Sequence, residues 1–317
     1  MSCTSGSSSN LQDTSETDTH VLDEPLSVLL ANVGNLDEVS DGPCGVEPYR
    51  GALCLMSQEG ALQENLTVIE PDVIAILEVL DADYCTEDTW DGDDDLACTD
   101  APDRDPYQQV RRLLGRDYTV VCDGIAHYDC IGVRSERMTL DQCGAGELCM
   151  GDAETPDHPP ACSEIGGKTS VSRVTGTLDD LEFTLVAAHP VNATDSEGDQ
   201  CRQAQLQQAF EDLPSGSTIV AGDMNMDPYR LYDSFDSALY WHTVVGTPLE
   251  SHEARFTAHS VTEDPPIPTW MDLATLDYVT SDFLTGTCQV LGEETGTTRL
   301  DGAVASMDHR AVLCQLQ

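Results

Sequence analysis

The sequence predicts an α/β fold with a mixed β-sheet. Apolar runs of strand length alternate along the 317 residues with segments whose apolar residues recur at helical spacing. Two of the runs are separated only by Asp179-Asp180, a hairpin turn that only antiparallel strands can use. No internal repeat is evident. A hydrophobic content of 40% suffices for one large core, so we expect a single domain over residues 25–317.

The first half of this domain is expected to begin with a buried strand in residues 26–36, which ends at Asn32 and a glycine turn. A helix is predicted in 53–70 and ends at Pro71-Asp72. A second buried strand, 73–80, follows and carries Glu78. The following elements are an amphipathic helix and two strands joined by a turn, in residues 107–116 and 118–134.

The second half starts with the two strands around the Asp179-Asp180 hairpin, 169–178 and 181–190. A helix is predicted in 201–213, and the apolar run "STIVAGDMN" follows as a strand in 217–225. Two more strands are expected near the end of the sequence, in residues 275–283 and 311–316.

Three segments have no periodicity and are interpreted as additions to the core. They are a polar N-terminal tether in 1–24, an acidic loop in 85–100 and a Cys-rich insertion in 139–167. The tether contains Cys3, which resembles the lipidated cysteine of a bacterial lipoprotein and would attach the protein to a membrane. The alternative is an incidental thiol. In the acidic loop, "DGDDD" is interpreted as a solvated run in preference to a calcium site.

The charge is strongly acidic, with 58 Asp and Glu against 14 Lys and Arg, a formal net charge of −44 and Lys168 as the only lysine. Binding long nucleic acids normally depends on cationic side chains, so such binding would require cations or salt that screens the repulsion. A dense carboxylate surface is typical of a halophilic protein, because it keeps the protein hydrated and soluble in salt.

The thirteen cysteines include no CxxC pair, which argues against zinc fingers and thioredoxin chemistry. Disulfides formed in an oxidising compartment are the better explanation, so we expect an extracellular, cell-surface or periplasmic protein. Proximity along the chain or between expected strands suggests three pairs: Cys85 with Cys98, Cys122 with Cys130, and Cys288 with Cys314.

Polar groups stand where buried strands end, at positions that a purely structural account would leave apolar. They are Asn32, Glu78, His189, Asp223 with Asn225, and Asp277, and Asp308-His309 precedes the last strand. At one end of a sheet they would form a cluster of carboxylates, amides and histidines suited to a divalent metal and a phosphate ester. Hard oxygen ligands favour Mg²⁺, Mn²⁺ or Ca²⁺ over zinc. Trp270 is assigned to the core.

Six motifs, "NVGNL", "AILEV", "AAHP", "IVAGDMNMDP", "TLDYV" and "SMDHRAV", occur in the order and approximate spacing of one family. The sequence thus resembles the endonuclease/exonuclease/phosphatase superfamily of DNase I-like, metal-dependent phosphoesterases. The resemblance implies a four-layer α/β sandwich of two packed mixed β-sheets, with the active site in a cleft at their shared edge.

The resemblance also implies roles for the acidic and amide residues. Glu78 would be the principal ligand of Mg²⁺, or of Mn²⁺ or Ca²⁺, helped by Asn32 and Asp308. Asn225 would contact the scissile phosphate or a second ion. Asp223 would position or deprotonate the attacking water.

The histidines would stabilise the transition state. His309, oriented by Asp277, would donate to a phosphate oxygen, and His189 would be a second donor. Tyr128 matches a further phosphate-contacting residue of the exonuclease-like branch, with His127 as the alternative.

Three positions depart from the family pattern. Leu77 replaces the usual Gln before the metal-binding Glu, Met307 replaces the Ser before the last Asp-His, and Leu80 stands where nucleases tend to have a basic residue. We therefore expect an extracellular phosphoesterase that uses in-line water attack on a nucleic acid, a phospholipid head group or a small organophosphate. The alternatives are a DNase- or RNase-type nuclease, and a catalytically silent member that binds a metal or a partner.

Overall fold

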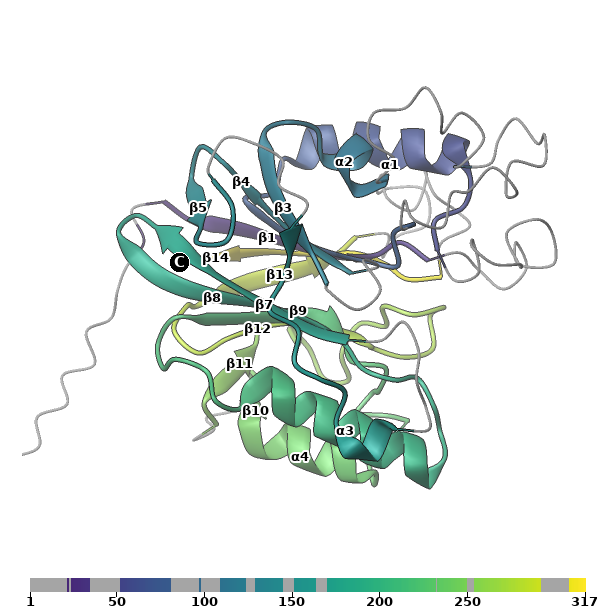
Figure 1. The fold of residues 1–317 in the computed structure, drawn as a ribbon. Coiled ribbons are helices and arrows are strands. Elements are labelled where there is room, and N and C mark those ends of the chain that lie inside the picture. The colour runs from purple at the N-terminus through teal and green to yellow at the C-terminus, as the bar shows by residue number, and fades with distance from the viewer. Residues whose placement is uncertain are drawn as a thin grey trace, which may run out of the picture.

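Two β-sheets lie face to face in the centre of the molecule, and helices cover the outer face of each (Figure 1). This is a computed structural model, and it describes residues 22, 24–34, 52–80, 97, 109–123, 129–144, 151–163, 170–231, 233–249, 254–291 and 308–317. The α/β/β/α arrangement confirms the predicted four-layer sandwich. The predicted tether, apart from residues 22 and 24, and the acidic loop, apart from Ala97, lie outside the described residues.

The first sheet contains the N-terminal strands together with the last two strands of the chain. Its order is β13 (Gly286–Val290), β14 (Val312–Leu316), β1 (Leu26–Asn32), β2 (Val73–Leu77), β4 (Cys130–Arg134), β3 (Tyr118–Cys122) and β6 (Gly151–Asp152). β1 and β2 are parallel, whereas β14 pairs antiparallel with β1, so the sheet is mixed. Its outer face carries α1 (Met56–Ile69) and α2 (Gln109–Leu114) (Figure 1).

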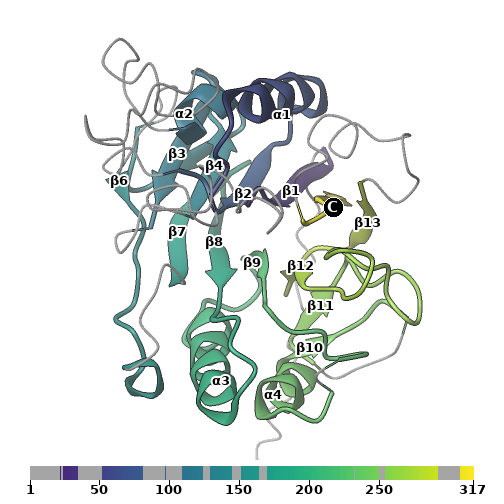
Figure 2. The same ribbon diagram turned by 90° about the vertical axis from the view of Figure 1, so that its right-hand side faces the viewer.

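The second sheet is also mixed. Its order is β10 (Val245–Gly246), β11 (Phe256–Ala258), β12 (Asp277–Ser281), β9 (Thr218–Asp223), β8 (Leu181–His189), β7 (Ser170–Leu178) and β5 (Met138–Leu140). β8 and β9 are parallel, and β12 runs antiparallel to β9. Its outer face carries α3 (Ser196–Phe210) and α4 (Asp236–Val244) (Figure 2).

The central strands are mostly apolar between their ends because they are buried on both faces. In β1, Val28 and Leu30 point into the core between the sheets, and Leu29 and Ala31 point into the core under α1 and α2. A third core lies between the second sheet and α3 and α4. Three apolar layers thus separate four layers of secondary structure.

The structure differs from the sequence prediction mainly at segments with short strands. Residues 139–167 were expected to add no core element, yet β5 and β6 extend both sheets. Strands β10, β11 and β13 and helix α4 were not predicted. These strands have two to five residues, too few for a period of two to stand out from neighbouring loops. The predicted strand 73–80 ends at Leu77, so Glu78 follows the strand instead of lying within it.

Three disulfides join described residues. Cys122–Cys130 and Cys288–Cys314 confirm two predicted pairs, and each joins directly opposed residues of antiparallel strands. Cys162–Cys201 was not predicted, and it ties the 3₁₀ turn η6 (Pro160–Cys162) to α3. The proposed Cys85–Cys98 pair lies outside the described residues. In the described part of the chain, none of the helices has the length and apolarity needed to cross a membrane.

Removing the Cys162–Cys201 disulfide is expected to destabilise the protein. The bridge spans 39 residues, and in the chain-entropy account a loop of this length contributes about 4 kcal/mol. The double Cys→Ala variant should therefore unfold at a clearly lower urea concentration. The Cys122/Cys130 double variant opens a bridge of only 8 residues and should lose about 2.5 kcal/mol. Equal midpoints for the two variants would contradict this ranking.

His259 is expected to make stability fall in mild acid. It is 2% exposed, its Nε2 has no hydrogen-bond partner among the described residues, and burial lowers the pKa of His259 to about 4. The unfolded chain binds a proton on this histidine near pH 6.5, whereas the folded protein does so only near pH 4. The contribution of His259 to the free energy of unfolding is therefore complete above pH 6.5 and is lost as pH falls towards 4.

The expected loss from this group at pH 5 is about 2 kcal/mol relative to pH 7. Urea unfolding of wild type and His259→Gln at both pH values measures it, because the other titrating groups are shared. Between pH 7 and pH 5, the free energy of unfolding should fall less in the variant than in wild type. Equal drops would mean that His259 does not set this dependence.

Candidate active site

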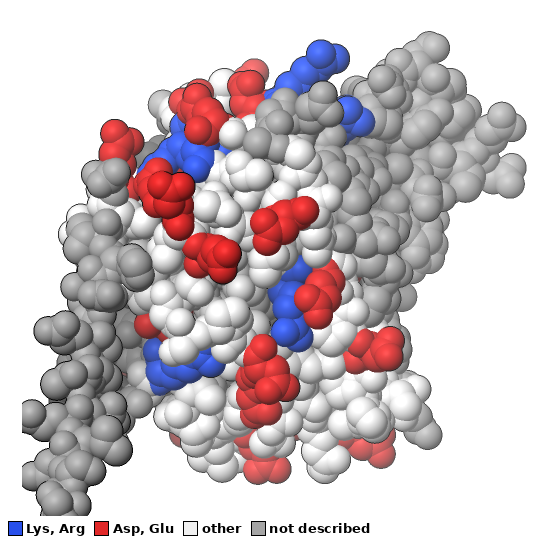
Figure 3. Space-filling view, turned by 60° about the vertical axis from the view of Figure 1, so that its left-hand side comes forward, with Lys and Arg blue, Asp and Glu red and all other residues white. Residues whose placement is uncertain are grey.

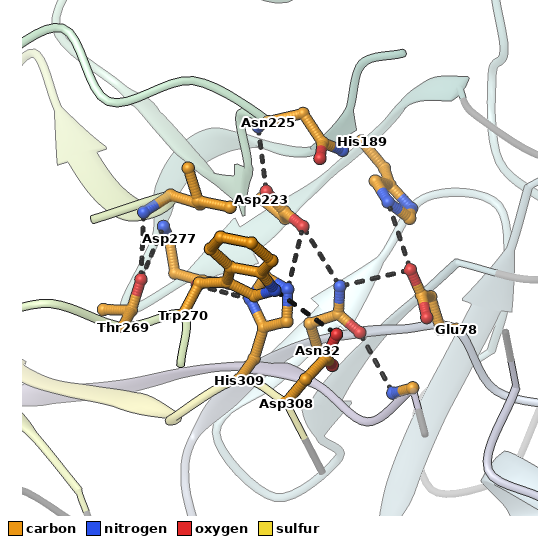
Figure 4. Close-up of polar contacts among 12 residues, drawn as sticks. Asn32, Glu78, His189, Asp223, Asn225, Thr269, Trp270, Asp277, Asp308 and His309 are labelled. Carbon is orange, nitrogen blue, oxygen red and sulfur yellow. Dashed lines mark hydrogen bonds and ion pairs between the residues drawn. The ribbon is translucent and has the colours of Figure 1, made fainter. Parts of the chain in front are cut away.

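Polar side chains from both sheets meet at one edge of the sandwich (Figure 4). They lie at the C-terminal ends of the parallel pairs β1/β2 and β8/β9 and at the start of the antiparallel strand β12. Eight of the nine predicted site residues are in this group: Asn32, Glu78, His189, Asp223, Asn225, Asp277, Asp308 and His309. Tyr128 lies outside the described residues, as does the alternative His127.

Asn32 connects the two sheets. It is 1% exposed, and its Nδ2 donates to Glu78 Oε1 at 3.3 Å and to Asp223 Oδ2 at 3.1 Å. Its Oδ1 accepts from the Gly34 N–H at 3.0 Å. In this orientation the amide nitrogen, and not the oxygen, faces the carboxylates. Asn32 therefore acts as a bridge between Glu78 and Asp223, whereas the resemblance implied an oxygen ligand.

Glu78 is the most accessible acid among the ion-paired carboxylates of this cluster. Its side chain is 22% exposed, against 2% for Asp223 and 1% for Asp277. The backbone turns at φ 60° immediately after β2, and the Glu78 N–H donates to Asp129 Oδ1 at 3.2 Å. Positive φ is costly for a residue with a side chain, and strain of this kind concentrates at functional sites.

The pKa of Glu78 is raised to about 7, mainly by burial. His189 and His309 oppose the shift, and the negative charges of Asp308 and Asp223 add to it. Burial also raises the pKa of Asp223 and of Asp308. Burial thus disfavours the charged form of all three carboxylates, and a bound divalent cation would offset that cost.

His189, the last residue of β8, is held by an acid that the sequence analysis missed. Its Nδ1 lies 3.2 Å and 3.1 Å from the two carboxylate oxygens of Asp129, and its Nε2 lies 3.5 Å from Glu78 Oε1. Burial alone would lower its pKa, but Asp129, with Glu78 and Asp223, raises the pKa of His189 to about 10. The signal was a buried Asp directly before a strand, in "AHYDC".

Asp223 ends β9 at a point where the backbone must pass very close to β8. A Cβ on Gly222 would lie 1.9 Å from the Ala188 carbonyl oxygen, so only glycine fits before Asp223. Asp223 Oδ1 accepts from the Asn225 N–H at 2.8 Å. Asn225 has φ 50°, and its Nδ2 donates to the Pro190 carbonyl at 2.9 Å. This tight turn presents Asp223 and Asn225 together.

His309 forms the opposite side of the cluster. Its Nδ1 lies 2.7 Å from Asp277 Oδ2, and its Nε2 lies 3.5 Å from Asp223 Oδ2. Burial alone would lower its pKa, but the carboxylates of Asp277 and Asp223 raise the pKa of His309 well above its usual range. Asp277 is the direct cross-strand partner of Asp223. The imidazole is thus cationic and oriented at neutral pH.

Trp270 lies at this site and not in the core, which corrects the sequence-based assignment. The side chain is half-buried, and its Nε1 donates to Asp308 Oδ2 at 3.3 Å. Trp270 also forms a β-bridge with His309 (Figure 4). The hydrogen bond fixes Asp308, one of the predicted metal ligands.

Two sets of residues have the chemistry to bind a cation. Ligand atoms of Asp223, Asp277 and His309 lie within 4.8 Å of one another. However, the 2.7 Å contact from His309 Nδ1 to Asp277 uses one of these groups as a hydrogen-bond donor. The second set is Glu78, whose side chain is the more accessible carboxylate, with Asp308, whose negative charge acts on it.

The structure resembles several solved structures. A humanised D. rerio TDP2 with 14 mutations is 15% identical, with a TM-score of 0.57 over 92% of this chain and 99% of that chain. The human Nocturnin catalytic domain with bound sulfate is 13% identical, with a TM-score of 0.55 over 94% of each chain. An endonuclease/exonuclease/phosphatase from Beutenbergia cavernae is 16% identical, with a TM-score of 0.57 over 93% and 72%.

The similarity lies in structure and not in sequence. The sequence matches no protein-family model and no curated protein. At identities of 13–16%, these structures establish the fold. The chain therefore has the DNase I-like fold of the endonuclease/exonuclease/phosphatase proteins, as its sequence motifs predicted.

Proposed function

We propose that this protein is a divalent-metal-dependent phosphoesterase that hydrolyses phosphodiester or phosphomonoester bonds by in-line attack of water. The observation that carries the proposal is the Asn32 bridge between Glu78 and Asp223, flanked by two histidines that are each held by an aspartate. Hydrolysis of a phosphate ester requires a group that activates water and groups that stabilise the developing negative charge. A carboxylate can do the first, and oriented imidazolium groups can do the second.

Glu78 and Asp308 would hold the metal, which when bound would supply Lewis-acid charge stabilisation at the phosphate. Asp223 would orient the attacking water and take its proton as the new P–O bond forms. Asn32 keeps Asp223 in place by donating to its Oδ2 at 3.1 Å. The raised pKa of Asp223 fits the role of a proton acceptor at neutral pH.

The two histidines would donate to phosphate oxygens as negative charge builds in the transition state. His309 is oriented by Asp277 at 2.7 Å, and His189 by Asp129 at 3.1 Å. Their raised pKa values keep both imidazoles protonated at neutral pH, so each provides a charged donor. Asn225, and Tyr128 by resemblance, would make further contacts to the phosphate.

The substrate class is a phosphate ester: a nucleic acid, a phospholipid head group or a small organophosphate. One solved structure of D. rerio TDP2 contains a single-strand DNA product, which supports keeping a nuclease as the second candidate. The charge argues against a protein that tracks along DNA. On the face shown in Figure 3, acidic side chains are spread over the surface and no continuous basic track crosses its described part.

Leu80 adds to this argument. At this position a nuclease of the family tends to have a basic residue, and here the leucine is 2% exposed. It packs into the structure and makes no surface for a DNA backbone. A small phosphate ester therefore fits the described residues better than a long polyanion.

The disulfides support an extracellular or periplasmic location. The three bridges between described residues join cysteines of the folded core or its helices, as expected for a protein that folds in an oxidising compartment. Attachment to a membrane through a lipidated Cys3 remains part of the proposal. Mass analysis of the native N-terminus tests it, and an unmodified Cys3 would end it.

Metal removal is the experiment that tests the proposed function. We expect hydrolysis of at least one member of a panel of bis-nitrophenyl phosphate, DNA, RNA, sphingomyelin and inositol phosphates. Excess EDTA should reduce the rate to background, and Mg²⁺, Mn²⁺ or Ca²⁺ should restore it. If no member of the panel is hydrolysed with any ion, at low or high salt, the silent metal- or partner-binding alternative replaces the enzyme.

A further inference from the structure

Thr269 is a buried threonine that contacts the main chain on both sides of the Asp277–His309 pair. It is 0% exposed. Its Oγ1 accepts from the N–H groups of Leu276 at 3.0 Å and of Asp277 at 3.1 Å (Figure 4). Its carbonyl oxygen accepts from the Arg310 N–H at 2.7 Å, directly after His309. Thr269 is therefore hydrogen-bonded both to the backbone of Asp277 and to the backbone of Arg310, the residue after His309.

The Asp277 carboxylate has few other contacts that could fix it. Oδ2 lies 2.7 Å from His309 Nδ1, whereas Oδ1 is buried without a hydrogen-bond partner among the described residues. The side chain is 1% exposed, so water does not hold it from outside. Its orientation thus depends on the position of its own backbone and on the histidine that it orients. The Thr269 hydroxyl anchors that backbone at the start of β12, beside the pairing of β12 with β9.

We infer that Thr269 is a positioning residue for the Asp277–His309 pair. Its side-chain oxygen fixes the start of β12, and its carbonyl fixes the segment that carries His309, so both partners of the 2.7 Å contact share one anchor. The β-branched side chain of threonine restricts χ1, which keeps the oxygen aimed at the two N–H groups. The effect on catalysis rests on the proposed function, whereas the effect on the hydrogen bond does not.

The first test compares three variants. Thr269→Val keeps the shape but leaves two buried N–H groups without an acceptor, and we expect kcat to fall about 10- to 100-fold with little change in KM. Thr269→Ser retains the oxygen and should recover most of kcat. Thr275→Val is the matched control, because Thr275 is also buried and its Oγ1 donates to the Ile267 carbonyl at 2.9 Å, away from the pair. It should keep wild-type kcat.

A double-mutant cycle separates positioning from general loss of structure. In a His309→Ala background, Thr269→Val has no imidazole to misplace, so it should reduce kcat by less than about 2-fold. Two independent and multiplicative losses would overturn the inference. So would wild-type kcat in Thr269→Val, or an equal loss in Thr275→Val.

The second test does not require activity. The His309 Nδ1–H proton, held 2.7 Å from Asp277 Oδ2, should give a downfield ¹H NMR resonance that is absent in His309→Ala. It should persist in Thr269→Ser and Thr275→Val and be lost or shifted in Thr269→Val. An unchanged resonance in Thr269→Val overturns the inference even in an active enzyme. A lost resonance in a protein that hydrolyses no substrate supports the positioning role and rejects only the proposed function.

Discussion

The Asp223→Asn variant is expected to lose at least about 10³-fold in kcat/KM. The substitution keeps the shape of the side chain and one of its two acceptor oxygens, but an amide cannot take the proton of the attacking water. The side chain is 2% exposed, and its two oxygens accept from Asn225 and Asn32. Steady-state kinetics on the preferred ester, with circular dichroism to confirm folding, measures the effect.

Asp227→Asn is the matched control for this prediction. Asp227 is 0% exposed and lies four residues further along the same segment. Its oxygens accept from the N–H groups of Tyr229 at 3.0 Å and Thr275 at 2.9 Å, so it stabilises turns. Its variant should unfold more easily while keeping most of the activity. If Asp223→Asn keeps more than about a tenth of wild-type kcat/KM, Asp223 is not the base.

The second large effect is expected at Glu78. Glu78→Gln keeps an acceptor for Asn32 but removes the charge, so affinity for Mg²⁺ or Mn²⁺ should fall at least about 100-fold and kcat/KM should fall with it. Calorimetric titration of the metal-free protein measures the affinity. Glu59→Gln is the control, because Glu59 pairs with Arg112 between α1 and α2 and should affect stability alone.

Thermal unfolding gives an independent test of the same substitution. The pKa of Glu78 is raised to about 7, so folding disfavours the ionised carboxylate when no cation is present. The uncharged amide of the Glu78→Gln variant should therefore raise Tm in the metal-free protein. The added metal should raise Tm in wild type and leave the variant unchanged. A lower metal-free Tm in the variant would contradict the raised pKa of Glu78.

Much of the architecture could be predicted because the central strands are buried on both faces. The runs that became β1, β2, β8 and β9 are almost entirely apolar, so they stand out in the sequence. By contrast, β5 and β6 lie in a segment rich in Cys, Gly and Pro, where pairing with a sheet that already exists decides the structure.

The candidate site was predictable for the same reason, because a polar residue at the end of an apolar run is conspicuous. Asp129 was missed since it precedes a strand instead of ending one, and Trp270 since an isolated aromatic residue usually belongs to the core. Thr269 shows the limit of such reasoning. Its importance comes from main-chain contacts across 8 positions to Asp277, which no local pattern encodes.

The sheet order has a consequence for how the protein is made. β14 lies between β13 and β1 in the first sheet, and Asp308 and His309 immediately precede it. A ribosome-bound chain that has not yet been extended past Leu316 cannot fill that place in the sheet. Asp223 would then lack His309, whereas Glu78 would keep His189. We therefore expect the complete site to form only when this strand has joined the sheet.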